Sequence, residues 1–135
     1  MEKLIIAYGP VVVQDEKVLL DISGDDDYWK FCGGKIIEGA DLRETARKRA
    51  KEELGIDIKI QDSNPYIMYV MQEKEDGMYD VILVHWLADA EGEVVPGEMV
   101  KKWKWIPLSE LDNYNLAPNI KPVLSYYKYI CFINI

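Results

Sequence analysis

The sequence predicts an α/β or α+β sandwich formed by a single domain over residues 1–135. Three observations predict it: β-rich runs lie on both sides of one strongly helical segment, an apolar and aromatic segment closes the chain, and no repeat or Pro/Gly/Ser-rich linker divides it. A chain of 135 residues, 49% of them hydrophobic, can bury a core without disulfides. Cys32 and Cys131 lie far apart with no metal-binding spacing, so we expect two reduced thiols.

Short strands are expected in the first quarter of the chain. The runs rich in Val, Ile and Leu are 4–8, 11–13 and 18–22. Gly9 and Pro10 are expected to separate the first two runs, and residues 14–16 to form a hairpin turn before the third. Residues 24–27 predict a polar loop. Residues 28–31 alternate apolar and polar side chains like a short strand, and the glycines that follow permit a sharp turn.

The helix is predicted over residues 41–54. Leu42, Ala46, Ala50 and Leu54 recur at a spacing of four, which places them in one apolar stripe. Gly55 is expected to end the helix because glycine tolerates the left-handed conformation found at helix ends.

The second half of the chain predicts more strands and a final helix. The expected strands are 56–60, 66–72 and 79–88, with a hairpin turn at 75–77, and a short strand through Trp103 and Trp105. A closing helix over 120–132 is expected to pack on the sheet. Its aromatic residues favour core packing, with a homodimer contact as the alternative; they are Tyr126, Tyr127, Tyr129 and Phe132.

The net charge argues against several partners. Twenty-four acidic and 16 basic residues give a charge of −8, which repels nucleic acids and anionic membranes. No signal-peptide pattern and no apolar run of membrane-spanning length is present in the sequence. We therefore expect a soluble, cytoplasmic protein with no nucleic-acid or membrane partner.

Residues 33–56 read GGKIIEGADLRETARKRAKEELGI, and this segment resembles the box of the Nudix (MutT-like) family, G-x5-E-x7-R-E-U-x-E-E-x-G-U, where U is aliphatic. Gly34 takes the first glycine, Glu52 and Glu53 the glutamate pair, and Gly55 the last glycine. The flanking segments 28–31 and 105–111 also resemble the family's aromatic strand and its W-x-P-L-x-E-L segment. The resemblance implies a Nudix-type α/β/α sandwich with a mixed sheet, the box helix on one side and the C-terminal helix on the other.

The resemblance also implies an activity. The family hydrolyses nucleoside diphosphates joined to another group, with Mg²⁺ or Mn²⁺ held against the diphosphate and water attacking phosphorus. It implies that Glu52 and Glu53 are the catalytic and metal-ligating residues, and that Gly33, Gly34 and Lys35 contact the substrate. A small, nucleotide-like molecule is therefore the expected ligand.

Three positions of the box differ from the family pattern. Ala40 replaces the first glutamate, Lys48 the arginine, and Arg49 the glutamate that follows the arginine. Exchanging a negative for a positive charge about 5 Å from a divalent ion costs roughly 3 kcal/mol with water-like screening, and about 13 kcal/mol at an effective dielectric of 20. We therefore expect metal binding to be weak or absent, with Arg49 paired to Glu52 or Glu53.

Two functions follow, and the enzyme is favoured. The first is weak or altered pyrophosphohydrolase activity, for which carboxylates near the box, those of Glu38, Asp41 and Glu98, are candidates to compensate for the lost glutamates. The second is a non-catalytic module that binds a nucleotide-like ligand or a protein partner. The lone His85 lies in an apolar strand, which favours a core or edge position over a catalytic base.

Overall fold

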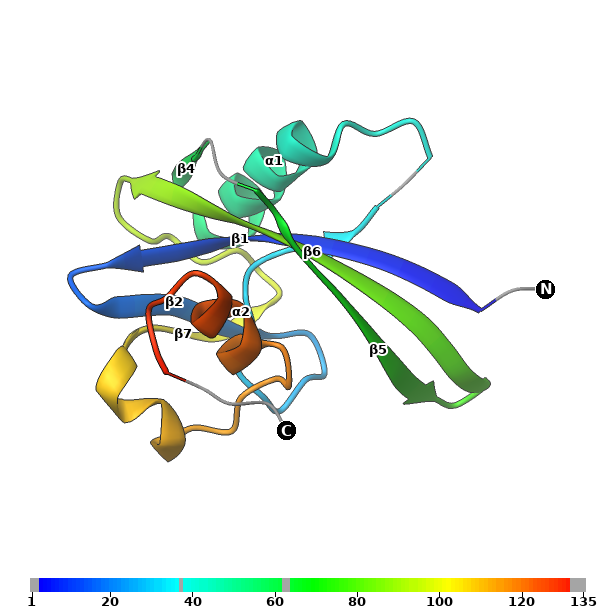
Figure 1. The fold of residues 1–135 in the computed structure, drawn as a ribbon. Coiled ribbons are helices and arrows are strands. Elements are labelled where there is room, and N and C mark those ends of the chain that lie inside the picture. Colours follow the sequence, from blue (N-terminus) through cyan, green and yellow to red (C-terminus); the bar gives the residue numbers. More distant parts are fainter. Residues whose placement is uncertain (1–2, 37, 62–63, 132–135) are drawn as a thin grey trace.

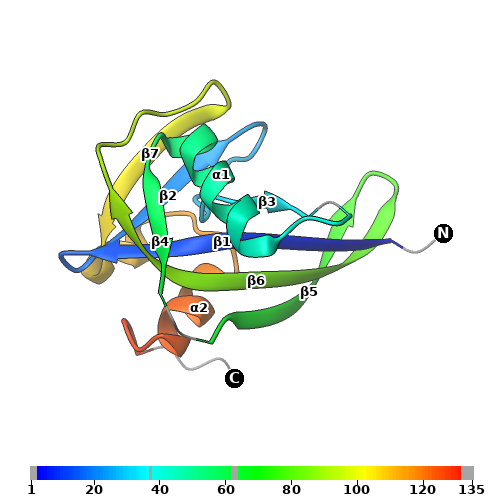
Figure 2. The ribbon, with the colours of Figure 1, turned by 90° about the horizontal axis from the view of Figure 1, so that it is seen from above.

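A mixed β-sheet with a helix on each side makes up the fold in a computed structural model, which describes residues 3–36, 38–61 and 64–131 (Figures 1 and 2). The elements are β1 (Leu4–Gln14), β2 (Lys17–Ser23), β3 (Gly34–Lys35), α1 (Leu42–Leu54), β4 (Asp57–Ile60), β5 (Tyr66–Lys74), β6 (Gly77–Glu91), β7 (Val100–Pro107), the 3₁₀ helix η1 (Leu108–Asn113) and α2 (Ile120–Tyr126). The predicted α/β/α sandwich is confirmed.

The strands follow the order β4-β6-β1-β2-β7, with β3 also pairing with β1 and β5 with β6. Strands β1 and β6 run parallel, and the other strand pairs among the described residues are antiparallel, which makes the sheet mixed. Two predicted hairpins are confirmed: β1 turns into β2 through Asp15 and Glu16, and β5 turns into β6 through Glu75 and Asp76. The strand through Trp103 and Trp105 is β7.

Two hydrophobic cores cover the faces of the sheet. The core beneath α1 contains Ala46, Ala50 and Leu54 from the predicted stripe. The core beneath α2 contains Ile120, Val123 and Leu124. Because side chains alternate along a strand, β2 contributes Leu19 to the first core and Val18 and Leu20 to the second.

Strand β1 does not end at Gly9 and Pro10, so the predicted break there is wrong. The strand pairs in parallel with β6 from Leu4 to Val12, and this pairing carries the backbone straight through both residues. Glycine is required at position 9 for a different reason: a Cβ atom there would lie 2.3 Å from the carbonyl oxygen of Cys32.

The final helix is shorter than predicted. It ends at Tyr126, and Phe132 lies outside the described residues. Lys128 adopts a left-handed conformation with φ of 65°, its N–H donates to the carbonyl of Ser125, and the N–H of Tyr129 donates to the carbonyl of Leu124. These two bonds form a Schellman motif, which stops a helix.

The aromatic residues of this segment have different environments. Tyr127 packs against the core beneath α2, as predicted, and its hydroxyl donates to the carbonyls of Asn64 and His85 at 2.9 and 3.0 Å. Tyr126 is exposed but contacts the rings of Tyr66 and Tyr127. Within the described ranges, no helix combines the length and apolarity needed to cross a bilayer.

Candidate functional site

Helix α1 carries the glutamate pair of the box. Asp41 caps its first turn by accepting a hydrogen bond from the N–H of Glu44 at 3.0 Å, and Gly55 ends it with φ of 68°. The apolar stripe of the helix faces the sheet. Glu53 lies on the same side of the helix and is only 7% exposed. The neighbouring Glu52 is exposed to solvent. The two glutamates therefore occupy different environments.

The glycine segment, residues 32–34, lies against strand β1 through two close backbone contacts. A Cβ atom at Gly33 would lie 2.0 Å from the carbonyl oxygen of Tyr8, and the approach at Gly9 to Cys32 is its counterpart on β1. Only glycine at both positions lets the two backbones lie this close. As a result, residues 32–34 lie between β1 and the side chain of Arg49.

Asp21 and Lys30 are placed side by side by the backbone. They form an antiparallel bridge in which the N–H of each residue donates to the carbonyl of the other, at 3.0 and 2.9 Å. Residues paired in this way present their side chains on the same face, and Nζ of Lys30 lies 3.1 Å from Oδ1 of Asp21. The strand predicted at 28–31 is present only as two isolated bridges, this one and Trp29 to Leu116.

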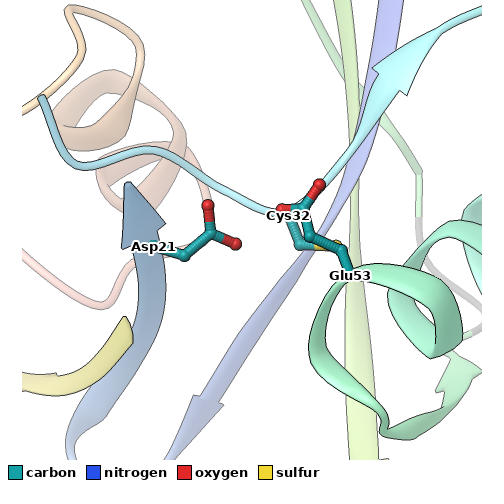
Figure 3. Close-up of side chains that lie close together, drawn as sticks. All are labelled: Asp21, Cys32 and Glu53. Atoms are coloured by element: carbon teal, nitrogen blue, oxygen red, sulfur yellow. The ribbon is translucent and has the colours of Figure 1, made fainter. Parts of the chain in front are cut away.

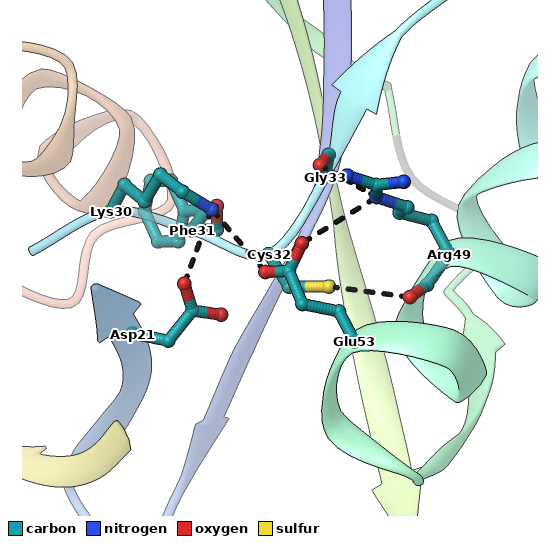
Figure 4. Close-up of polar contacts among 7 residues, drawn as sticks. All are labelled: Asp21, Lys30, Phe31, Cys32, Gly33, Arg49 and Glu53. Atoms are coloured by element: carbon teal, nitrogen blue, oxygen red, sulfur yellow. Dashed lines mark hydrogen bonds and ion pairs between the residues drawn. The ribbon is translucent and has the colours of Figure 1, made fainter. Parts of the chain in front are cut away.

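Both carboxylate oxygens of Glu53 face cations of the protein (Figure 4). Nζ of Lys30 lies 3.3 Å from Oε2, and Nε of Arg49 lies 3.5 Å from Oε1. Nε of Arg49 also donates a hydrogen bond to the carbonyl of Gly33 at 3.2 Å. The predicted pairing of Arg49 with a box glutamate is therefore present, with Glu53 as the partner.

Three potential metal donors lie close together inside this network. A carboxylate oxygen of Asp21, Sγ of Cys32 and a carboxylate oxygen of Glu53 lie within 4.8 Å of one another (Figure 3). All three residues are buried. Within the described part of the chain, Oδ1 of Asp21 forms the ion pair with Lys30, and Oδ2 accepts no hydrogen bond. Among the described residues, the ammonium group of Lys30 is the cation that contacts both carboxylates.

This arrangement does not fit a divalent ion as it stands. Mg²⁺ binds oxygen at about 2.0–2.1 Å. An ion at this distance from the oxygens that Lys30 contacts, at 3.1 and 3.3 Å, would overlap the ammonium group. An ion shared by Asp21 and Glu53 would have to displace Lys30, and an ion on the other oxygen of Glu53 would meet Arg49. Glu52, the other member of the glutamate pair, is exposed.

Burial and neighbouring charges shift the pKa values of the residues in this network. Burial, assisted by the neighbouring Glu53, raises the pKa of Asp21 above its ordinary value against the lowering effect of Lys30. Burial lowers the pKa of Lys30, but Asp21 and Glu53 outweigh burial and raise it above its ordinary value. Burial also raises the pKa of the Cys32 thiol well above its usual range. The ammonium of Lys30 is thus the stable charge of the network.

A cavity of about 420 Å³ adjoins the network. Its walls come from β1, β5, β6 and the segments around residues 26–35 and 117–119. Its charged lining residues in the described chain are Lys30, Lys35, Lys74 and Asp26. The cavity wall is therefore cationic on balance, although the whole chain carries −8. Such a wall favours an anionic ligand.

His85 lines the cavity and is buried, as predicted for a core histidine. Its Nδ1 lies 3.2 Å from the carbonyl oxygen of Gly9, and its Nε2 lies 2.9 Å from Nδ2 of Asn119. These partners suit a neutral ring with the proton on Nδ1. Burial lowers the pKa of His85 to about 4, against the raising effect of the Gly9 carbonyl.

The other predicted site residues lie at varied distances from the network. Gly33, Gly34 and Lys35 line the cavity, while Lys48 is exposed on α1. Ala40 is half-buried just before the cap of α1.

The three candidate compensating acids are all exposed. Asp41 already serves as the helix cap. Glu98 follows Gly97, whose N–H donates to the carbonyl of Glu53 at 2.9 Å, so its backbone lies beside the end of α1. Glu38 lies in the turn before α1. Among the described residues, Lys30 and Arg49 form their ion pairs with Asp21 and Glu53 and with none of these three acids.

Sequence reasoning missed Asp21 and Lys30 as members of the site. One signal was available for Asp21, a single charged residue inside the apolar strand VLLDI. For Lys30 the alternation of residues 28–31 indicated a side chain facing away from Trp29 and Phe31, but not which carboxylate it meets.

Comparison with known proteins identifies the family. The model of the NUDIX domain matches residues 6–127, and the chain belongs to the Nudix family. Members of this family hydrolyse pyrophosphate bonds in nucleotide-linked substrates and generally use divalent metals.

Similar sequences and structures agree with this membership. The nucleoside triphosphatase NudI of Escherichia coli is 25% identical over 120 residues, which cover 79% of this chain and 84% of NudI. The uncharacterised Nudix hydrolase YvcI of Bacillus subtilis is 23% identical and covers 86% of this chain and 74% of its own. The solution structure of the E. coli ORF135 protein superposes with a TM-score of 0.72 and 25% identity, over 93% of this chain and 89% of that one.

Proposed function

We propose that this protein is a weak pyrophosphohydrolase that acts on a nucleoside diphosphate joined to another group. The observation that carries the proposal is the position of Lys30, which lines the cationic cavity and at the same time contacts Glu53 of the box. A diphosphate in this cavity would lie beside the glutamate pair that the family uses for hydrolysis.

The charges around Glu53 support a low activity. Lys30 and Arg49 already neutralise both of its oxygens, so a divalent ion binds there only in competition with two resident cations. In this proposal Lys30 and Lys35 bind the diphosphate, and Glu52 and Glu53 remain the catalytic residues. Mg²⁺ or Mn²⁺ is expected to bind weakly.

A second function, binding without turnover, is favoured by one observation. Arg49 occupies the position of a box glutamate and lies across the glycine segment, where it donates to Gly33. If this arrangement is fixed, the protein holds a nucleotide-like ligand or a protein partner and releases it unchanged.

A panel assay separates the two functions. ADP-ribose, dinucleoside polyphosphates, sugar nucleotides and nucleoside triphosphates are incubated with the protein, Mg²⁺ or Mn²⁺, and released phosphate or mononucleotide is measured. The same panel is run with the triple variant Ala40→Glu/Lys48→Arg/Arg49→Glu and with the double variant Glu52→Gln/Glu53→Gln. Slow turnover by the native chain that increases in the triple variant and disappears in the double variant supports the enzyme. Ligand binding by calorimetry with no turnover supports the binding module, and native turnover that survives in the double variant contradicts the proposed catalytic residues.

The partners and location are also part of the proposal. A small nucleotide-like ligand is supported by the cationic cavity, and the protein is proposed to be cytoplasmic with no nucleic-acid or membrane partner. The homodimer stays a prediction, which light scattering of the purified protein tests. Cell fractionation tests the location.

A further inference from the structure

We propose that Lys30 is the resident counter-ion of Glu53, which excludes a divalent ion from this carboxylate and presents its own charge to a diphosphate in the cavity. The proposal rests on the proposed function for its ligand class. It assigns to one side chain two opposite effects: weaker metal binding and stronger anion binding.

The first step is that Lys30 is held in place rather than free. Two backbone hydrogen bonds with Asp21 hold the backbone of Lys30 beside β2. The ammonium group of Lys30 contacts the carboxylates of Asp21 and Glu53 at 3.1 and 3.3 Å. Its side chain is 21% exposed, whereas those of Asp21 and Glu53 are 0% and 6% exposed. Figure 4 shows the ammonium group between the two carboxylates.

The second step is charge balance. Two buried carboxylates without a cation would be strongly destabilising, and a divalent ion or a fixed ammonium group can each supply the missing charge. This chain supplies the ammonium group. A divalent ion at Glu53 would therefore find one carboxylate already paired on both oxygens, by Lys30 and by Arg49.

The third step is access to the ligand. Lys30 is the residue that both lines the cavity and forms an ion pair with Glu53 in the described chain. An anionic group in the cavity can approach the exposed part of this side chain without displacing it. Lys35 and Lys74 line the same cavity and add to the attraction.

The test uses the double variant Asp21→Asn/Lys30→Met in the full chain. This variant removes one charge of each sign, so the net charge stays at −8, and it leaves no buried Asp21 carboxylate without a partner. Mn²⁺ binding is measured by electron paramagnetic resonance. Inorganic pyrophosphate binding is measured by calorimetry with a chelator present. Neither measurement depends on turnover, so failure of the proposed hydrolysis leaves both results interpretable.

The expected changes have opposite signs. Compared with the single variant Asp21→Asn, the double variant lacks one positive charge about 4 Å from a divalent ion at Glu53, which should tighten Mn²⁺ binding by about thirtyfold with water-like screening. Pyrophosphate binding should weaken by at least about tenfold, the usual effect of losing a direct charged contact. A damaged fold would weaken both, so the opposite signs distinguish the proposed role from a merely structural one.

Three controls complete the experiment. Lys51→Met removes a lysine from the exposed side of α1, where it pairs with Asp57, and should change neither affinity. Lys30→Arg in the otherwise native chain keeps the charge, and its Mn²⁺ binding should stay as weak as that of the native chain. Adding Glu53→Gln to the double variant should abolish the gain in Mn²⁺ affinity.

The proposal is overturned if the folded double variant binds Mn²⁺ no more tightly than Asp21→Asn, or if its affinity for pyrophosphate equals that of Asp21→Asn. If the variant does not fold, the native chain decides: the proposal requires its Mn²⁺ affinity to be weaker than ~1 mM, and micromolar binding that Glu53→Gln abolishes overturns it.

Discussion

Asp21 and Lys30 exchange two backbone hydrogen bonds, and their side chains form an ion pair of 3.1 Å beside Glu53 of α1. The backbone bridge determines where the lysine lies, and the ion pairs determine what it neutralises. Glu53, the box glutamate that would otherwise be available to a metal ion, is thereby held in an ion pair with Lys30.

Lys30→Met should destabilise the protein by about 3–5 kcal/mol, because it leaves two buried carboxylates with less compensating charge. Asp21→Asn/Lys30→Met should recover much of this loss. Urea unfolding at pH 7 measures both. Lys51→Met, on an exposed ion pair, should cost less than about 1 kcal/mol. A Lys30→Met protein as stable as the native chain would show that the network contributes little.

His85 should make the protein less stable in acid. Its pKa of about 4 in the folded state lies below the ordinary value of 6.5, so the folded state binds fewer protons than the unfolded state between these values. The associated stability is present above pH 6.5 and is lost as the pH falls toward 4, by up to about 3 kcal/mol at about 1.4 kcal/mol per pKa unit.

His85 is the one histidine in the sequence, so its NMR signals can be titrated without ambiguity. The expected midpoint is near pH 4. The stability difference between the native chain and His85→Gln, measured in urea, should shift in favour of the variant as the pH falls. A midpoint near 6.5 would contradict the buried, neutral ring.

Gly9→Ala should destabilise the protein by about 1–3 kcal/mol, because the new Cβ atom would lie 2.3 Å from the carbonyl oxygen of Cys32, which is backbone and cannot move aside alone. Gly34→Ala is the matched control. Its Cβ would first meet Nε of Arg49 at 3.4 Å, at the end of a flexible side chain. Thermal unfolding of both variants checks the prediction, and equal losses in the two would contradict it.

The two thiols should react at very different rates. Cys131 is exposed, whereas Cys32 is buried with a pKa raised well above its usual range by burial. At pH 7.5 a thiol reagent should modify one cysteine quickly and the second only on unfolding. Cys131→Ser should remove the fast phase; a fast phase that persists in this variant would place Cys32 at the surface.

The sequence predicts the fold well because local patterns determine most of it. The stripe from Leu42 to Leu54 and the cap at Gly55 give α1 within one residue. The end of α2 was missed because Lys128, a lysine in a left-handed conformation, carries no glycine signal. The break expected at Gly9 was wrong because the parallel pairing with β6, a contact distant in sequence, continues the strand.

The site could be predicted only in part. The helix period brings Arg49 and Glu53 together, four residues apart, and their ion pair follows from it. The position of Lys30 could not be obtained in this way, because it depends on a bridge to Asp21 and on the packing of the glycine segment against β1. The most influential charge of the site is therefore a tertiary feature.

A crystal of the native protein soaked in Mn²⁺ tests the central claim most directly, because anomalous scattering locates the ion. We predict no ion within bonding distance of Glu53, with Lys30 and Arg49 still on its two oxygens. An ordered ion ligated by Glu52 and Glu53, with Lys30 and Arg49 turned to solvent, would contradict the account.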